Sequence, residues 1–279
     1  MNTETKIFLA SIISKSVRFI RQIFKIKNNI FRRNNIYWCL DLAQGIDFAI
    51  YLQGGFEPST ILSYKKIVKK NDVVLDIGAN IGAHTLPLAA MVGEKGRIIA
   101  FEPTDYAFKK LQTNLDLNKS LASRVTTVQA LLVGNSKTEK PNSIPSSWSL
   151  EKKSEDSIHP VHRGTYQSLH DAFVVRLDEW VSANKLDKVD FIKIDVDGHE
   201  IDVIEGGYQV LERFSPIIIM EFSEYIFEER GRSFDELIEI LKKLQYSCFT
   251  TSGNHLKMDE SLKKHIPKRG SINVILKRD

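Results

Sequence analysis

A strand pattern that runs directly into a glycine turn constrains the fold of this chain more than any other feature. Residues 73–77 read Val-Val-Leu-Asp-Ile, glycines stand at both ends of the stretch 78–82, and the apolar stretch 83–91 predicts a helix. Glycine permits a positive φ or the close approach of another group to the backbone. A helix that begins after such a turn directs free amide N–H groups toward a ligand. The segment therefore predicts the first strand–turn–helix unit of an α/β fold, with a binding site at the turn.

Strand and helix patterns alternate from residue 71 onward. This alternation indicates right-handed crossovers and a mostly parallel sheet with helices on both faces, and the closely spaced last strands predict an antiparallel strand at one edge. We predict one domain over residues 71–279, with an insertion at about 134–172, where prolines and clustered serines break the pattern. The predicted strands are 73–77, 97–101, 125–133, 189–194, 216–222, 247–251 and 272–276, and the predicted helices are 83–91, 106–118, 200–213 and 234–245.

Positive charge is concentrated at the beginning of the chain. The net charge is +4, but residues 1–33 hold eight Lys and Arg against one Glu, which gives +7 for this segment and leaves −3 for the rest. Because the body of the chain is not basic, the sequence argues against a nucleic-acid partner. Two cysteines without a C-x-x-C spacing argue against a disulfide framework and a structural zinc site, so we expect a cytoplasmic protein.

The first 70 residues are predicted to form a basic amphipathic helix and a lead-in segment. Residues 5–27 have helical periodicity, with Phe8, Ile12 and Phe19 on one half of the helix and Ser14 and Arg18 on the other. No run reaches the about 18 apolar residues of a spanning helix. The helix could associate peripherally with the inner face of a membrane, apolar face down. It could equally pack on its own domain and leave a basic face in solvent, and the periodicity does not choose between these alternatives.

An acidic residue at the end of the second predicted strand points to a nucleoside. Glu102 follows Asp76 by 26 positions, and a carboxylate in this place can accept hydrogen bonds from both ribose hydroxyls. A dinucleotide needs glycine where this chain has Asn80, and Asp76 would repel a pyrophosphate but suits an ammonium group. Ribose, adenine and an amino-acid tail together describe S-adenosylmethionine, and NAD is disfavoured.

Three motifs make the chain resemble the FkbM-type family of S-adenosylmethionine-dependent methyltransferases. They are the D-x-G-A-N-x-G turn at 76–82, the Phe-Glu-Pro strand end at 101–103, and the stretch Ile-Lys-Ile-Asp-Val-Asp-Gly-His-Glu at 192–200. The likeness covers most of 71–222 and extends forward to 50–52 and 55–57. It implies a class I methyltransferase (Rossmann-like) fold. It also implies a methionine site lined by Asp76, Gly78, Ala79, Asn80, Gly82 and Thr85, ribose binding by Glu102, and an adenine border at Gln129 and Ala130.

The third motif supplies the candidate catalytic residues. Asp195 ends the fourth strand of the parallel pattern, where this architecture places the transferable methyl group, so we expect it to contact the cofactor and the acceptor. A poorly acidic alcohol needs a base or a metal. His199 titrates near neutrality and is the candidate base, while Glu200 is either catalytic or part of a helix cap with Asp197.

A metal site at the same strand ends is a weaker alternative. Asp195, Asp197 and Glu221 could supply oxygen ligands for Mg²⁺, but acidic strand ends also occur without metal, and we do not predict a metal site. The expected function is methylation of a hydroxyl on a sugar, glycolipid or secondary metabolite, as the resemblance implies. A non-catalytic S-adenosylmethionine-binding protein and an N-methyltransferase are the alternatives. Nothing in the sequence indicates the oligomeric state.

Overall fold

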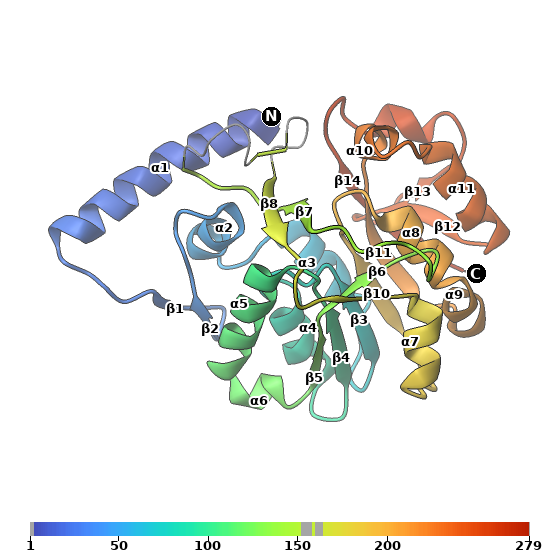
Figure 1. Cartoon of the computed structure of the whole chain (residues 1–279), viewed down its shortest axis with the longest axis horizontal. Coiled ribbons are helices and arrows are strands. Elements are labelled where there is room, and N and C mark those ends of the chain that lie inside the picture. Colours follow the sequence, from blue (N-terminus) through green and yellow to red (C-terminus); the bar gives the residue numbers. More distant parts are fainter. Residues whose placement is uncertain (1–2, 152–157, 160–163, 279) are drawn as a thin grey trace.

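An eight-stranded sheet forms the centre of the computed structural model, which describes residues 3–151, 158–159 and 164–278 (Figure 1). Its parallel strands are β3 (Val73–Ile77), β4 (Arg97–Phe101), β5 (Val125–Val128), β10 (Phe191–Ile194) and β11 (Ile217–Phe222). The strands β12 (Ser247–Thr250), β13 (His255–Leu256) and β14 (Ile272–Lys277) extend it on the far side of β11. β14 runs antiparallel between β11 and β12, and β13 pairs antiparallel with β12 at the edge. The order β13-β12-β14-β11-β10-β3-β4-β5 confirms the predicted fold class.

Helices cover both faces of the sheet because alternate strand residues point in opposite directions. Leu75 and Ile192 pack toward α7, α8, α9 and α11, whereas Val74 and Phe191 pack toward α3 and α4. Strands buried on both faces need nearly continuous hydrophobic sequence, which these segments have. The helices here are α3 (Pro58–Tyr64), α4 (Thr85–Val92), α5 (Asp105–Asp116), α6 (Lys119–Ala122), α7 (Leu177–Ala183), α8 (Glu200–Gly206), α9 (Tyr208–Phe214), α10 (Glu224–Glu229), α11 (Phe234–Lys243) and the 3₁₀-helix η2 (Leu262–His265).

Two elements that we predicted as continuous are divided. The predicted strand 125–133 breaks at Gln129, because β6 (Ala130–Leu132) leaves the main sheet and pairs in parallel with β9 (Phe173–Val175). The predicted helix 200–213 breaks at Gly207, between α8 and α9. Its neighbour Gly206 lies so close to the carbonyl oxygen of Val133 that a Cβ would be 2.1 Å from it. The glycines therefore let the helical segment approach the displaced β6.

The insertion folds against the glycine turn. β7 (Ser143–Ser146) and β8 (Thr165–Ser168) form an antiparallel pair, and the following residues 147–150 run beside 43–45. The Gly45 N–H donates to the Trp148 carbonyl at 2.8 Å, and the Leu150 N–H donates to the Ala43 carbonyl at the same distance. The insertion thus connects the N-terminal segment to the rim of the predicted binding site.

The N-terminal segment begins with the predicted helix. α1 (Thr3–Ile23) extends along one end of the molecule in Figure 1 and contacts α2. The other elements of the segment are β1 (Ile30–Arg33), β2 (Ile36–Cys39) and α2 (Gly45–Gln53). β2 is joined to α5 by a hydrogen bond of 2.7 Å from the Cys39 N–H to Asn114 Oδ1. Among the described residues, no helix combines the length and the apolar character needed to cross a bilayer.

Candidate functional site

The glycine turn lies against the end of β10. Gly78 has φ +81°, and a Cβ at this position would lie 1.8 Å from the carbonyl oxygen of Asp195. Any side chain here would therefore separate the two strand ends. Gly82 also has a positive φ, and its nearest neighbour is the flexible side chain of Leu111. The first glycine brings the turn and the end of β10 together, as a shared binding site requires.

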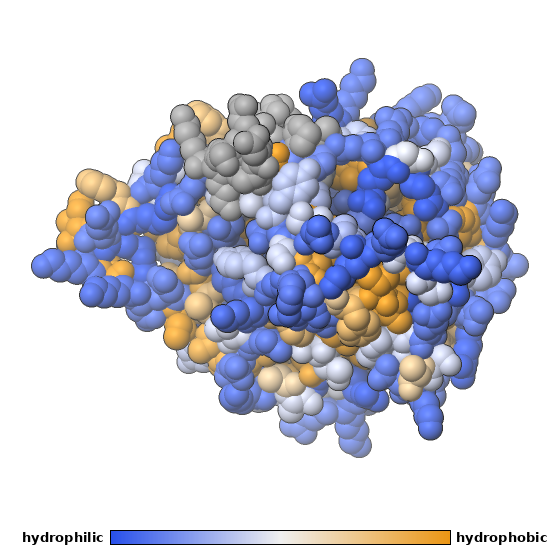
Figure 2. All heavy atoms as spheres, in the orientation of Figure 1, coloured by the Kyte–Doolittle hydropathy of each residue, from blue (hydrophilic) through white to orange (hydrophobic). Residues whose placement is uncertain are grey.

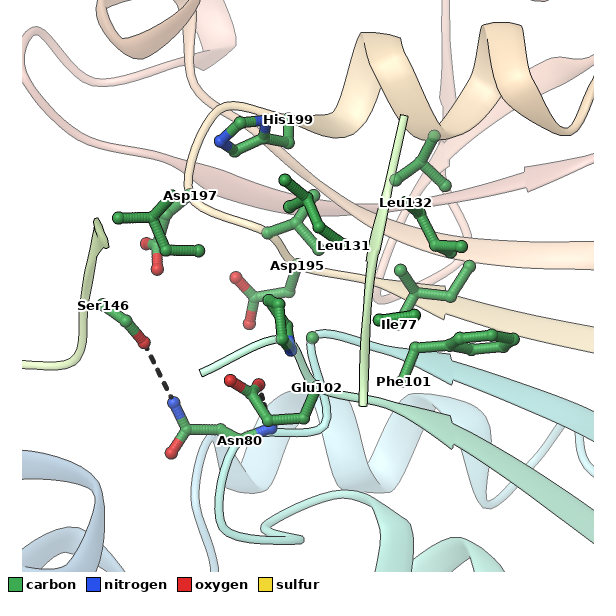
Figure 3. Close-up of a pocket in the computed structure, with 16 residues that line it drawn as sticks. Ile77, Asn80, Phe101, Glu102, Leu131, Leu132, Ser146, Asp195, Asp197 and His199 are labelled. Carbon is green, nitrogen blue, oxygen red and sulfur yellow. Dashed lines mark hydrogen bonds between the residues drawn. The ribbon is translucent and has the colours of Figure 1, made fainter. Parts of the chain in front are cut away.

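Glu102 is held in place by the turn and by the beginning of α5. Its Oε2 accepts the Asn80 N–H at 2.9 Å, while its Oε1 accepts the N–H and the hydroxyl of Thr104 at 2.9 and 2.5 Å. Burial raises the pKa of this carboxyl. The carboxyl group borders a cavity and retains free lone pairs (Figure 3). It can therefore accept hydrogen bonds from the hydroxyl groups of a ligand while it keeps its bonds to Asn80 and Thr104.

Asn80 connects the turn to the insertion. Its φ of 49° is in the left-handed region, which asparagine tolerates better than most residues. The side-chain amide donates to Ser147 Oγ at 2.9 Å and to Ser146 Oγ at 3.4 Å, and the second of these bonds is drawn in Figure 3. The serines at the end of β7 therefore hold the insertion over the turn.

Asp76 lies beneath the turn and lines neither cavity described below. It is fully buried, its Oδ2 accepts the Thr85 hydroxyl at 2.6 Å, and its Oδ1 has no hydrogen-bond partner among the described residues. Burial raises the pKa of Asp76, and the positive charge of Lys193 opposes that rise. An unpaired buried carboxylate oxygen is costly. The unpaired oxygen would be stabilised by a cationic or hydrogen-bond-donating group nearby.

The first cavity, of about 510 Å³, opens at the ends of β3, β4 and β10. Leu131, Leu132 and Ile144 give it an apolar side, and Glu102 stands at its polar side (Figure 3). The predicted site residues on its wall are Gly78, Asn80, Glu102, Ala130, Asp195 and His199. Gln129 is not on this wall, because its side-chain amide donates to Asp105 Oδ1 at 2.8 Å.

The second cavity, of about 830 Å³, lies on the other side of the turn. Ala79 lines it, and the two cavities share a wall made by Gly78, Asn80, Asp195 and Asp197. The remaining polar and aromatic lining comes from distant parts of the chain, namely Phe56, Glu57, His84, Ser147, Trp148, Lys193, Glu221, Tyr225 and Ser271. Two ligands could therefore meet at the shared wall.

Lys193 and Asp195 form an ion pair at this wall. Lys193 Nζ donates to Asp195 Oδ2 at 2.9 Å, and the lysine side chain is 3% exposed. Although burial opposes its charge, the nearby carboxylates Asp195, Asp76 and Glu57 raise the pKa of Lys193 above its ordinary value. The lysine is thus a fixed cation that orients Asp195 and leaves the Oδ1 of that residue available to a ligand.

Two buried histidines have a free Nε2 among the described residues, one beside each cavity. His199 lines the first cavity, and its Nδ1 lies 3.2 Å from Asp202 Oδ2 and 2.9 Å from an Arg230 nitrogen. His84 lines the second cavity, and its Nδ1 lies 3.3 Å from the Tyr64 hydroxyl. Burial lowers the pKa of both rings. Both are therefore neutral at pH 7.

Glu57 lies beside His84 on the wall of the second cavity. Its Oε2 lies 3.9 Å from His84 Nε2 and accepts the Asn273 amide at 3.0 Å. Glu57 has φ 47°, a strained conformation for a residue with a side chain. Burial raises its pKa, and the charge of Asp195 raises it further. We did not predict roles for Glu57, His84 or Lys193. The signal for Glu57 and Lys193 in the sequence was that residues 55–57 and 192–200 belong to segments that resemble the family.

Glu200 supports the loop that precedes α8. It is 2% exposed, lines neither cavity, and accepts the Val196 N–H at 3.0 Å. Burial raises its pKa to about 7. Asp197, the proposed cap partner, has φ 49° and lies on the shared wall. The N-cap residue of α8 is His199, without a side-chain cap, so the predicted cap of Asp197 and Glu200 does not form, and Glu200 instead supports the backbone of the preceding loop.

The three acidic residues considered for Mg²⁺ do not form a metal site in the part of the chain that the structure describes. Glu221 accepts a hydrogen bond from the Ser271 hydroxyl. Burial and the charge of Asp195 hold the pKa values of Asp197 and Glu221 well above their ordinary range.

Comparison with known proteins identifies the family of this chain. A family model described as "Methyltransferase FkbM domain" matches residues 76–248. The hexuronic acid methyltransferase AglP of Haloferax volcanii is 26% identical over 151 residues, which cover 54% of this chain and 56% of that protein. The chain thus spans little more than half of that relative's length. The methyltransferase sdnD of Sordaria araneosa is 26% identical over 58% of this chain and 73% of that protein. A solved methyltransferase FkbM from Methylobacillus flagellatus has a TM-score of 0.43 at 17% identity, over 78% of this chain and 52% of that chain.

Proposed function

The chain belongs to the methyltransferase FkbM domain family, and we propose that it transfers a methyl group from S-adenosylmethionine to a hydroxyl oxygen of a sugar or glycolipid. The observation that carries this proposal is the pair of cavities that share one wall at Asp195. One has the carboxylate and the apolar side that a nucleoside needs. The other carries the hydrogen-bonding and aromatic side chains that a sugar ring needs.

The residues of the first cavity fit the cofactor. Glu102 would hold the ribose hydroxyls, and Ala130 and Leu131 would border the adenine, because they add apolar side chains to the wall of the same cavity. Asp76 lines neither cavity, so its negative charge would favour the ammonium of the amino-acid tail from beneath the turn, without direct contact. When bound, S-adenosylmethionine supplies an electrophilic methyl carbon on a positively charged sulfur.

The second cavity suits a polyhydroxylated acceptor. Trp148 and Phe56, whose ring centroids are 6.3 Å apart, provide aromatic surface, while Glu57 and Glu221 can accept sugar hydroxyls. AglP, by its name, acts on a hexuronic acid. That name supports a saccharide acceptor, although the carboxylates of this cavity disfavour an anionic sugar.

The chain's own residues position the acceptor oxygen and take its proton. Asp195, fixed by Lys193, stands where the two ligands would meet, and alignment at such a point supplies much of the acceleration in a displacement reaction. The fully buried Tyr64 has no other acceptor for its hydroxyl among the described residues, so we assign its proton to the bond with His84 Nδ1. His84 Nε2 then carries hydrogen and is a donor.

Glu57 and His84 can hold one hydroxyl oxygen between them. The 3.9 Å between Glu57 Oε2 and His84 Nε2 is too long for a hydrogen bond, and a ligand oxygen near both atoms would give the unpaired His84 Nε2 a partner. His84 would donate to that oxygen and Glu57 would accept its proton as the new O–C bond forms. This assigns the base to Glu57, whereas the sequence favoured His199, which lines the first cavity.

Calorimetry with S-adenosylhomocysteine tests the cofactor site. We expect the wild type to bind and Glu102→Ala to bind about 10- to 100-fold more weakly, because hydrogen bonds to a charged group are lost. Glu221→Ala, which removes an acid from the second cavity, should bind as the wild type does. Failure of the wild type to bind, or equal affinity in Glu102→Ala, would overturn the cofactor assignment.

Transfer of labelled methyl from S-adenosylmethionine to a panel of neutral, amino and acidic saccharides tests the reaction. We expect label on a neutral or amino sugar, at an oxygen atom identified by NMR. Label on nitrogen would establish the N-methyltransferase alternative. Cofactor binding without transfer to any acceptor would favour the non-catalytic binding protein.

A further inference from the structure

α1 turns its apolar face away from the body of the protein. The large hydrophobic residues of α1 and the turn after it expose between 44% and 71% of their surface, and Figure 2 shows hydrophobic side chains among charged ones at this end of the molecule. These residues are Phe8, Leu9, Ile12, Ile13, Phe19, Ile20, Ile23, Phe24 and Ile26. In the rest of the described chain, large exposed hydrophobic residues are scattered and form no comparable group.

The opposite side of α1 attaches the helix to the domain. Ser14 is fully buried, and its hydroxyl donates to the Leu42 carbonyl at 2.5 Å. Ala10 and Val17 pack against the adjoining hydrophobic core, and Arg18 forms an ion pair with Glu151. Residues 10, 14, 17 and 18 share one helix face. The helix therefore packs on the domain mainly through the side that carries small and polar residues. Its apolar side faces away from the domain.

Positive charge lies beside the exposed apolar face and beyond its end. Lys15 lies on the solvent side of α1, Lys25 and Lys27 follow its last turn, and all three are exposed. Arg32 in β1 is exposed as well. With a net charge of +7 over residues 1–33, two copies of this surface would repel each other. An anionic lipid surface complements both the apolar face and the cations around it.

We propose that the outward face of α1 inserts into the headgroup layer of a membrane that contains anionic lipids, with the domain held on the opposite side of the helix. Apolar burial in the layer gives the affinity, and the flanking lysines make it depend on lipid charge. This attachment leaves the helix–domain contacts of Ser14 and Arg18 intact. It is independent of the reaction proposed above.

Co-sedimentation of the full chain with vesicles tests this surface. We expect binding to phosphatidylcholine vesicles that contain roughly one third phosphatidylglycerol, and at least about tenfold weaker binding to phosphatidylcholine alone. The triple variant Ile12→Ser, Phe19→Ser and Ile23→Ser should lose at least about tenfold in binding to the anionic vesicles. High salt should weaken wild-type binding.

A matched control removes exposed hydrophobic residues elsewhere. Leu62→Ser with Phe173→Ser should bind vesicles as the wild type does, since Leu62 lies in α3 and Phe173 in β9, away from α1 in the sequence. Equal affinity of the wild type and the α1 variant for S-adenosylhomocysteine would show that the variant is folded. Equal vesicle binding by the two proteins would overturn the proposal. So would wild-type dimerisation through α1, lost in the triple variant, without any binding to vesicles.

Discussion

The two cavities that meet at Asp195 are built in different ways. The first is formed mostly by strand ends and the residues directly after them, so its key groups, Gly78, Asn80 and Glu102, belong to short contiguous motifs. The second is assembled from separate segments that include 56–57, 147–148 and 270–271, which lie far apart in the chain. The parallel sheet itself thus forms one site, while loops and the insertion form the other.

This difference teaches where specificity can change. A site at the carboxyl ends of parallel strands is fixed by the same hydrogen bonds that hold the sheet together. Loops can vary without loss of the sheet, and binding residues concentrate on them for that reason. We therefore expect the first cavity to bind a ligand common to the family and the second to select the acceptor of this particular chain.

Substitutions of Glu57 and of the two histidines should give the largest difference between the two cavities in their effects on rate and on cofactor affinity. Glu57→Gln and His84→Asn should each lower kcat by about 10²- to 10³-fold, because the acceptor hydroxyl loses its base or its positioning donor. S-adenosylhomocysteine affinity should stay within about twofold. His199→Asn should instead weaken cofactor binding and change kcat less. Calorimetry and steady-state kinetics on the three variants measure both quantities.

The opposite pattern would reassign the base. A large loss of kcat in His199→Asn, with unchanged cofactor affinity and a changed pH–rate profile, would support the assignment made from the sequence. Glu57→Asp is the conservative control, since it keeps the carboxylate and should recover part of the rate lost in Glu57→Gln.

Gly78→Ala should give the next largest effect, on folding. The added Cβ would meet the Asp195 carbonyl, and φ +81° is strained for alanine. We expect a loss of about 3 kcal/mol or more in the free energy of unfolding, measured by chemical denaturation. Gly253→Ala is the matched control, because φ is +95° there but nothing lies within 4 Å of the new Cβ. That variant should lose only about 1 kcal/mol in the free energy of unfolding. Equal losses in Gly78→Ala and Gly253→Ala would show that the ends of β3 and β10 can separate at little cost.

Sequence alone located part of the wall of the first cavity, because the determinants of that part are local. A buried strand, a glycine turn and an acid after the next strand each leave a pattern within a few residues, and Gly78, Asn80, Glu102 and Ala130 do line the cavity. Gln129 does not, because its neighbour in space, Asp105, binds its amide. That contact depends on how the insertion and α5 pack, which no local pattern records.

The second cavity was not predictable in the same way. Glu57 and His84 are 27 positions apart, and only the packing of α3 beside α4 brings them together. The direction in which α1 faces was also undecided, because amphipathic periodicity is identical whether the apolar side packs inward or outward. The contacts of Ser14 and Arg18 determine that direction, and they involve residues 28 and 133 positions away.

Substitution of Glu200 should have the smallest effect. It tests whether this residue of the third motif stabilises the fold or takes part in the reaction. Its pKa of about 7 lies above the ordinary 4.5, so the folded state holds the proton more tightly than the unfolded state. The stabilisation that comes from the tighter binding of this proton is complete below about pH 4.5 and is lost as the pH rises to about 7. We expect unfolding free energy to fall by about 2 kcal/mol between pH 5 and 8, and to fall less in Glu200→Gln. The exposed control Glu139→Gln should follow the wild type, and so would Glu200→Gln if this carboxyl were already ionised at pH 5.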